Sequence, residues 1–378
     1  MDPRQFHKRL YDAAAPLIPT GATVVCAVSG GLDSVAMLHG LYEVNRRRKC
    51  GWTLHVAHFD HALRPDSADD ARFVERMAES LDLPCHVQRR AVKRLAKSAR
   101  RSLEDAARTA RYQFLQRVAR RVGATRVAVA HHADDQAETV LHHILRGTGL
   151  TGLAGMSAHR PIASQSDICI VRPMLEIRRA DLTAYAAASG LAFREDATNS
   201  DMKFTRNRVR HELLPLIQSR FNSAVVDALV RLAEQARLAD AAIVRMASEL
   251  LSRASLSRTP QILCLDADIL ASAPAAVAAE ALRVSLESLG APLQSLDFER
   301  QSAALALLSG DGRRRTIELP GGYCVQRRGG RLLIGTATAM AAFDSRQIPT
   351  NRRPSRHTPA NTSGRSRPKP RATRRKSG

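Results

Sequence analysis

Short apolar runs alternate with segments of helical periodicity through the first half of the chain. An apolar run rich in β-branched residues predicts a buried strand at 23–28, and three further segments predict strands at 53–60, 84–90 and 125–132. Each run is followed by a segment whose apolar residues recur at helical spacing, at 34–44, 68–82, 103–123 and 134–147. Because strands and helices alternate, the pattern predicts an α/β fold with a doubly wound parallel sheet.

The pattern changes in the second half of the chain. Two long segments rich in Ala and Leu, 223–255 and 275–309, predict helices, and residues 314–335 predict three strands separated by Pro-Gly-Gly and Gly-Gly turns. These features predict a second, smaller domain that is mainly helical and ends in a β-meander. We therefore expect three regions, namely a catalytic domain at 1–217, the helical domain at 218–343 and a tail at 344–378.

The composition is that of a folded protein. The chain has 378 residues, of which 44% are hydrophobic and 25% are charged, so it can build a sizeable core. It contains no apolar run of about 18 residues, and its N-terminus carries charges where a secretion signal needs an apolar stretch. We therefore expect a cytoplasmic protein without a membrane partner. The six cysteines are scattered, which excludes CxxC zinc and redox motifs.

The net charge of +22 is unevenly distributed along the chain. Residues 345–378 hold eleven Lys and Arg, no Asp or Glu, and five prolines, so we predict a disordered basic tail. A second cluster, at 89–101, has seven cations in thirteen residues. Positive charge on both the body and the tail favours a polyanionic partner such as nucleic acid. The alternative is a solvated surface on a protein that is rich in Arg and Ala.

The strongest chemical signal is the sequence Ser-Gly-Gly-Leu-Asp-Ser at 29–34, between the first predicted strand and the first predicted helix. Two glycines let the backbone approach a ligand closely, and the N–H groups at the start of a helix bind anions. A carboxylate in such a loop would repel phosphate unless a cation lies between them, so Asp33 predicts Mg²⁺. The loop differs from the GxxxxGK[ST] loop of phosphoryl-transfer enzymes. The alternative is a plain strand–turn–helix junction.

Acidic residues and histidines follow the fourth predicted strand. Asp135 and Glu138 are three residues apart on a predicted helix, so they share one face and suit a cationic substrate. The alternative for these acids is compensation of the helix dipole. The nearby pairs of histidines, at 131–132 and 142–143, lack the spacing of a three-ligand zinc site.

The loop at 29–34 resembles the pyrophosphate-binding loop of the ATP-pyrophosphatase, or PP-loop, superfamily, whose members split ATP between its α- and β-phosphates. Further segments are similar to one family within it, the tRNA(Ile)-lysidine synthases. These segments are Val56–Arg64 (with Ala62 where the family usually has Gly), Ser67, Ala71–Val74, Glu104–Tyr112, Ala130–Thr139, Arg146–Leu153, Arg172–Leu175, Asp196, Asn199 and Arg206–Arg210. The resemblance is close over about 20–220 and weaker over 220–340.

This resemblance implies an ATP-dependent ligase that forms a C–N bond. ATP would adenylate O2 of the wobble cytidine in the CAU anticodon of an isoleucine tRNA, and pyrophosphate would leave. The ε-amine of free L-lysine would then attack C2, and AMP would leave. The modified tRNA would read the codon AUA instead of AUG.

The resemblance also implies roles for individual residues. ATP would contact Ser29, Gly30, Gly31, Leu32, Asp33, Ser34 and His58, and Mg²⁺ would bind Asp33. The catalytic residues would be Asp33, Arg111, Asp135 and Glu138, the last two recognising lysine. The tRNA would contact Arg146, Arg206 and Arg210. The alternatives are strand-end packing for His58 and a surface cation in an Arg-rich helix for Arg111.

Two other functions stay open at this stage. A PP-loop tRNA thiolase uses the same kind of loop, but it needs a sulfur-carrying cysteine or a cluster, against which the scattered cysteines argue. A non-catalytic RNA-binding protein on the same fold would not need the serines and acids that are present here. The sequence leaves the oligomeric state open, a dimer included.

Overall fold

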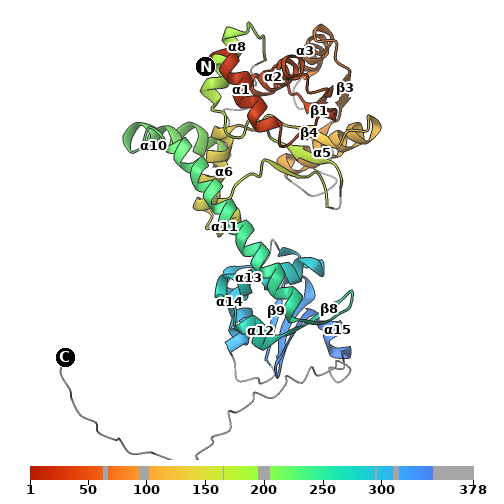
Figure 1. Cartoon of the computed structure of the whole chain (residues 1–378), viewed down its shortest axis with the longest axis vertical. Helices are drawn as coiled ribbons and strands as arrows, with labels where there is room; N and C mark the ends of the chain where they lie inside the picture. Colours follow the sequence, from red (N-terminus) through yellow and green to blue (C-terminus); the bar gives the residue numbers. More distant parts are fainter. Residues whose placement is uncertain are drawn as a thin grey trace, which may run out of the picture. The chain divides into compact units, whose positions relative to one another are not determined.

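The computed structural model describes residues 1–62, 67–92, 102–164, 166–194, 205–293, 296–309 and 315–343. The chain separates into two compact units, Met1–Ile243 and Val244–Gly378 (Figure 1). Several features of the sequence lie outside the described residues, namely the tail at 344–378, most of the basic cluster at 89–101, Leu63, Arg64, Asp196, Asn199 and the Glu104 side chain.

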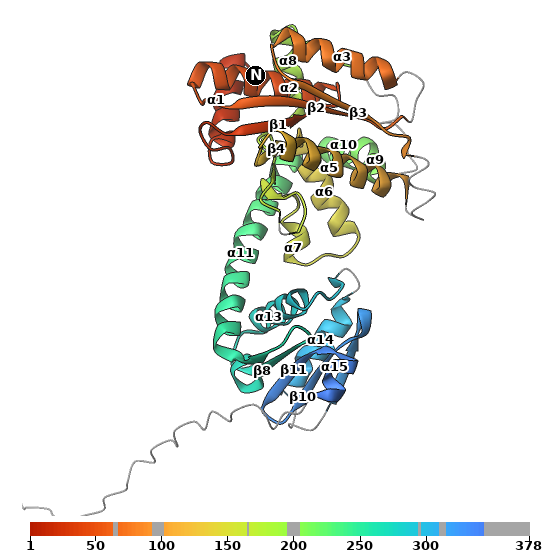
Figure 2. The same cartoon turned by 90° about the vertical axis from the view of Figure 1, so that its right-hand side faces the viewer.

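A six-stranded sheet forms the centre of the first unit (Figure 2). Its order is β3-β2-β1-β4-β6-β5, and its strands are β1 (Thr23–Ala27), β2 (Thr53–Asp60), β3 (Cys85–Arg89), β4 (Arg126–Ala128), β5 (His159–Pro161) and β6 (Cys169–Val171). All neighbours are parallel except β5 and β6, which are antiparallel. The sheet confirms the predicted doubly wound α/β fold.

Helices cover both faces of this sheet, so successive residues of the central strand are buried on opposite sides. Val24 and Cys26 of β1 belong to a core with Phe6, Met37 and other apolar residues of the helices on one side. Val25 belongs to a second core on the opposite face. The helices of the first core are α1 (Pro3–Ala14), α2 (Leu32–Arg48), α3 (Ser67–Ser80) and α8 (Arg179–Ala188), and α5 (Leu103–Arg121) covers the other face.

A third apolar cluster joins the helix after β4 to the end of the first unit. It packs Ala133, Ala137 and Val140 against Val209, Leu214 and residues of a long helix. The elements of this cluster are α6 (Ala133–Leu145), the π-helical turn η2 (Val209–Leu213), α10 (Leu214–Arg220) and α11 (Val225–Ala254). The short helices α7 (Leu150–Leu153) and α9 (Thr205–Arg208) also contact α6. This packing brings the segment around residue 208 onto α6, about 70 residues earlier in the chain.

The second unit contains a five-stranded antiparallel sheet of order β7-β8-β11-β10-β9. The predicted meander is confirmed as β9 (Arg315–Leu319), β10 (Tyr323–Arg328) and β11 (Arg331–Thr336), whereas β7 (Ser255–Arg258) and β8 (Ile262–Asp266) were not predicted. The helical elements are α12 (Ala267–Ala271), α13 (Ala275–Ser288), α14 (Phe298–Ala306), η4 (Leu307–Ser309), η5 (Pro320–Gly322) and α15 (Ala337–Ala342). Within the described ranges, every helix is too short or too polar to cross a membrane.

Candidate active site

The loop 29–34 connects β1 to α2 and is held by its two serines. The Ser34 hydroxyl donates to the Gly31 carbonyl at 2.9 Å, and it accepts the Ser29 N–H at 3.1 Å. The two hydroxyl oxygens lie 3.1 Å apart. Gly30 has a φ of +94°, in a region that residues with a Cβ rarely adopt, so the loop requires glycine there.

The start of α2 presents backbone donors without acceptors. Gly31 is the N-cap and supplies no side-chain cap, and the N–H groups of Leu32 and Asp33 have no hydrogen-bond acceptor among the described residues. Unsatisfied N–H groups at a helix N-terminus, together with the helix dipole, favour an anion. The loop therefore has the geometry of a phosphate-binding site.

Asp33 carries a carboxylate oxygen that lacks a hydrogen bond. Its Oδ1 is buried and makes no hydrogen bond within the described part of the chain, and the Arg179 Nε lies 3.9 Å from it. An unsatisfied carboxylate oxygen beside a phosphate site fits Mg²⁺, which prefers oxygen ligands and keeps several waters. The described residues contain no group of three or more side chains that could hold a metal alone. Asp33 would therefore share Mg²⁺ with phosphate oxygens and water.

His58 supports the base of the loop. The side chain is buried at the carboxyl end of β2, and its Nδ1 lies 2.8 Å from the Val28 carbonyl oxygen. Since a carbonyl can only accept, Nδ1 carries the proton and donates. The other ring nitrogen is buried without a partner in the described region. The observed contact is therefore with the loop's backbone, while the predicted contact with ATP stays a prediction.

His132 links the loop to the helix after β4. Its side chain caps α6 by accepting the Asp135 N–H, and the Asp135 carboxylate accepts the His132 N–H in return. The His132 Nε2 lies 3.6 Å from the Asp33 carboxylate and 3.4 Å from that of Asp135. Burial lowers the pKa of His132, but the hydrogen bond with Asp33 and the nearby carboxylates outweigh burial and raise it.

Asp135 and Glu138 lie together in the structure, and both are paired with arginines from the end of the first unit. The Arg210 Nε is 2.5 Å from Glu138 Oε1, and the Arg210 Nη2 is 2.8 Å from Asp135 Oδ1. The Arg206 Nε is 3.1 Å from Glu138 Oε2, and its Nη2 is 3.2 Å from Asp135 Oδ1. Two acids and two guanidiniums thus form one compact group, which we call the acid–arginine cluster.

The acid–arginine cluster is buried on its acidic side. Glu138 is 2% exposed and Asp135 is 8% exposed. Burial raises the pKa of Asp135, but the charges of His132 and Arg206 outweigh burial and lower it. Asp135 therefore stays ionised and needs a cation beside it. The predicted role of Arg206 and Arg210 in tRNA binding stays a prediction, and the observed partners of both are these acids.

The remaining predicted residues lie elsewhere on the first unit. Arg111 is on α5, with its guanidinium 5.3 Å from the ring centroid of Tyr112. Arg146 is the exposed C-cap of α6. Asp134, in contrast, has a structural role, since it accepts from the Arg178 guanidinium and from the Arg179 N–H at 2.7 Å.

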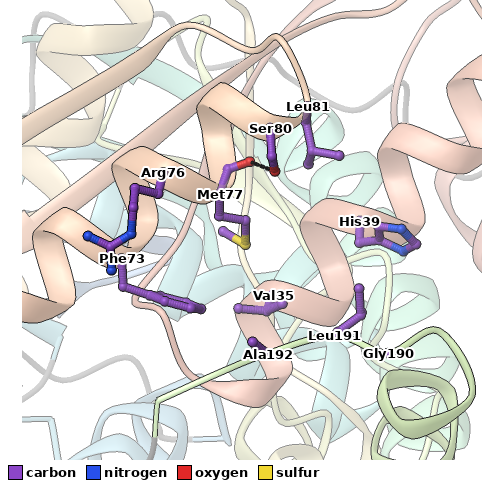
Figure 3. A pocket seen from close by; sticks show the side chains of 10 residues that line it. All are labelled: Val35, His39, Phe73, Arg76, Met77, Ser80, Leu81, Gly190, Leu191 and Ala192. Atoms are coloured by element: carbon purple, nitrogen blue, oxygen red, sulfur yellow. Dashed lines mark hydrogen bonds between the residues drawn. The ribbon is translucent and has the colours of Figure 1, made fainter.

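A cavity of about 280 Å³ lies between α2 and α3 (Figure 3). Side chains of α2 and α3 line it, among them Val35, Phe73 and Met77. The walls are mostly apolar; Arg76 is the only Lys, Arg, Asp or Glu among these lining residues, so the cavity offers no acid for an amine and a single guanidinium for a phosphate. We therefore assign the chemistry to the loop and the acid–arginine cluster, and not to this cavity.

His132 is a site residue that was not predicted, because adjacent histidines suggested only zinc ligation. The available signal was a histidine directly after a predicted central strand and directly before an acidic helix start. In an open α/β sheet, the carboxyl ends of the strands meet at the ligand site.

Comparisons with known proteins agree with this geometry. A family model described as the PP-loop domain matches residues 3–217. The tRNA(Ile)-lysidine synthase of Geobacter sulfurreducens is 45% identical over 246 residues, which cover 65% of this chain and 50% of that protein. The tRNA(Ile)-lysidine synthase of Symbiobacterium thermophilum is 36% identical over 320 residues, which cover 83% of this chain and 65% of that protein. The chain thus spans only part of the length of these relatives.

A solved structure shows the same fold at low sequence identity. The U34-tRNA thiolase from Methanococcus maripaludis superposes with a TM-score of 0.52 and 14% identity, over 61% of this chain and 77% of that one. At this identity the similarity concerns the fold alone.

Proposed function

Because the chain belongs to the PP-loop family, we propose that it ligates L-lysine to C2 of the wobble cytidine in the CAU anticodon of an isoleucine tRNA, with ATP as the energy source. In the first step O2 of the base attacks the α-phosphate of ATP and pyrophosphate leaves. In the second step the ε-amine of lysine attacks C2, the C2–O2 bond breaks and AMP leaves. The relatives named tRNA(Ile)-lysidine synthase support this choice within the family.

The observation that carries the proposal is that one loop contains both backbone N–H groups without acceptors and a carboxylate oxygen without a hydrogen bond, among the described residues. The N–H groups of Leu32 and Asp33 would hold the pyrophosphate portion of ATP. Asp33 would hold Mg²⁺, which when bound offsets negative charge on the leaving pyrophosphate. Ser29 and Ser34 keep the loop in this conformation through their mutual hydrogen bonds.

The acid–arginine cluster supports a site for the cationic end of lysine. Asp135 and Glu138 are buried and each is paired with guanidiniums, and a buried carboxylate needs a cation beside it. We propose that the lysine ammonium group enters by exchanging with one guanidinium, which keeps the charge of the buried group balanced. Arg206 is the more exposed of the two arginines, with 43% of its side chain exposed against 25% for Arg210, and so is the easier one to release.

His132 would then fix the position of the phosphate loop relative to the acid–arginine cluster. Its imidazole lies between the Asp33 carboxylate of the phosphate loop and the Asp135 carboxylate of the acid–arginine cluster. A fixed distance between these two acids would hold the adenylated base and the attacking amine near each other.

The thiolase alternative is less well supported. A thiolase needs a reactive thiolate or a cluster held by neighbouring cysteines. All six cysteines are buried or half-buried here, and burial raises the pKa of Cys26 to about 12 and that of Cys85 to about 11. Such thiols are poor nucleophiles near neutral pH.

A direct assay tests the proposal. The protein is incubated with ATP, Mg²⁺, isotope-labelled lysine and an unmodified transcript of the isoleucine tRNA, and the nucleosides are analysed by mass spectrometry. We expect the label in one modified cytidine and none in a methionine tRNA transcript, which also carries a CAU anticodon. Release of pyrophosphate without incorporation of lysine would contradict the proposed second step, and sulfur in the product would favour the thiolase.

A further inference from the structure

Three arginines surround one tyrosine on the β5–β6 side of the first unit. The guanidinium carbons of Arg108, Arg111 and Arg160 lie 5.1, 5.3 and 5.2 Å from the ring centroid of Tyr112. Two of these arginines are on α5, one turn apart, and Arg160 is on β5. Each single distance is that of a cation–π contact, but three such contacts on one ring place three positive charges close together.

A fourth arginine lies beside the same tyrosine and is buried. Arg172 follows β6 and is only 3% exposed. Its Nε donates to His131 Nδ1 at 3.1 Å, and its Nη1 donates to the Ser157 carbonyl at 2.6 Å. Burial lowers the pKa of His131 to about 3, so this imidazole is neutral, and neither partner of Arg172 is negatively charged.

The Tyr112 hydroxyl is a further polar group without a hydrogen-bond partner among the described residues. It is buried, and it makes no hydrogen bond of normal geometry within the described residues, although Arg172 is close enough to interact with it electrostatically. Burial raises the pKa of Tyr112, but the surrounding arginines outweigh burial and lower it. The hydroxyl is therefore free to donate a hydrogen bond to a ligand, and the surrounding arginines would attract an anionic one.

None of these four arginines has a carboxylate within ion-pair distance in the part of the chain that the structure describes. This differs from Arg178 and Arg210, which are partly buried and face Asp134 and Glu138 respectively. A buried guanidinium without an anion costs several kcal/mol. The cost is removed if a ligand supplies the missing negative charge.

We propose that this group, the arginine–tyrosine cluster, binds a phosphate group of the substrate. Its members are Arg108, Arg111, Tyr112, Arg160 and Arg172. Guanidiniums bind phosphate oxygens with paired hydrogen bonds, and the Tyr112 hydroxyl adds one more donor. The inference deepens the proposed function, because it assigns a binding site for the substrate of that reaction.

The position of the cluster favours a phosphodiester of the RNA over a phosphate of ATP. Arg172 is bonded to His131, which directly precedes the His132 that contacts Asp33. The cluster therefore adjoins the reaction centre, yet the phosphates of ATP already have a separate site at the loop 29–34. A phosphodiester beside the reacting cytidine would reach the cluster when that base enters the site.

Binding measurements with two probes test this inference. Arg108→Ala and Arg160→Ala remove outer members of the cluster, and Tyr112→Phe removes one hydroxyl with little change in packing. Arg117→Ala is the matched control, because Arg117 lies on the same helix, is exposed and donates to Gln88. Arg172 is left intact, since its burial makes its replacement a risk to folding. The probes are the unmodified isoleucine tRNA transcript without lysine, and ATP with Mg²⁺ without RNA.

We expect Arg108→Ala and Arg160→Ala each to weaken tRNA binding about 5- to 10-fold relative to Arg117→Ala. The slope of log affinity against log salt should fall by about 0.7 to 0.9 for each lost contact. Affinity for ATP should stay unchanged. Weaker ATP binding with unchanged tRNA binding would support the phosphate site but assign it to ATP. Unchanged affinity for both probes would overturn the inference. The binding measurement needs no catalysis, so failure of the lysine ligation assay would not contradict this inference.

Discussion

Arg210 and Glu138 form a two-point ion pair, with the Arg210 Nε 2.5 Å from Oε1 and the Arg210 Nη2 2.9 Å from Oε2. Parallel contacts of this kind are the strongest geometry that a guanidinium and a carboxylate can adopt. Because Glu138 is 2% exposed, its charge is compensated by protein groups and not by water. The pair therefore bears on both the stability of the fold and the recognition of a cationic substrate.

We expect Arg210→Ala to lower the free energy of unfolding by about 3 kcal/mol, because it leaves a buried carboxylate with one partner fewer. If the acids form a lysine site, free L-lysine should restore part of the lost thermal stability. L-Norleucine, which has the same carbon chain without the ε-amine, is the control and should restore none. Urea denaturation and thermal melts with each amino acid provide the measurement. Equal effects of both amino acids would argue against a cation site.

Glu138→Gln and Asp135→Asn should impair the use of lysine more than the use of ATP. Each variant removes one negative charge that would face the lysine ammonium group, so the KM for lysine should rise at least about 10-fold. The KM for ATP should change less than about twofold. Glu43→Gln is a suitable control, since Glu43 also pairs with two arginines but lies on α2. A similar rise in the KM for ATP would instead assign the acids to the nucleotide.

Asp33→Asn should abolish tRNA-dependent release of pyrophosphate while the fold stays intact. The Asp33 Oδ1 makes no hydrogen bond within the described residues, and the ion pairs of Asp33 with His132 and Arg179 are long, at 3.6 and 3.9 Å, so the variant should lose less than about 1 kcal/mol of stability. The rate should fall at least about 100-fold, because an amide cannot hold Mg²⁺ as a carboxylate does. Asp12→Asn, at an exposed ion pair on α1, serves as the control. Nearly normal pyrophosphate release by this variant would show that Asp33 is not a ligand of Mg²⁺.

Two variants of His132 should separate its role in the helix from its role in the site. His132→Ala loses the cap of α6 and should cost about 1 kcal/mol or more. His132→Asn restores a capping side chain and should recover part of that stability. Neither side chain can reach Asp33 as the imidazole does, so pyrophosphate release should stay low in both. Recovery of activity together with stability in His132→Asn would show that only the cap matters.

The sequence was sufficient to predict the parts of the fold that have strong local patterns. The parallel strands around the loop, the loop itself and the meander of the second unit were all predicted, because each has an apolar run bounded by glycines or helix starts. The strands β5 and β6 were not predicted, since three residues are too few to show a period. For β4, the prediction continued to residue 132, whereas the strand ends at Ala128 and the next residues turn toward the site.

The ion pairs of the acid–arginine cluster could not be predicted, because their members are far apart in the sequence. Arg210 and Glu138 are 72 positions apart, and only the packing of α9 and η2 on α6 brings them together. The sequence therefore showed two acids suited to a cation and two arginines suited to RNA, without the contact between them. The arginine–tyrosine cluster likewise draws on three separate segments, so no local spacing indicates it.

The position of His132 has a thermodynamic consequence for the binding of two ligands. One imidazole touches both Asp33 and Asp135, so a ligand that draws Asp33 toward a cation also changes the electrostatic environment of Asp135. Coupling between two binding events is reciprocal, so under the proposed function the factor by which the nucleotide changes the affinity for lysine would equal the factor by which lysine changes the affinity for the nucleotide. The His132 side chain would thereby couple the affinities for the two ligands before the reaction begins.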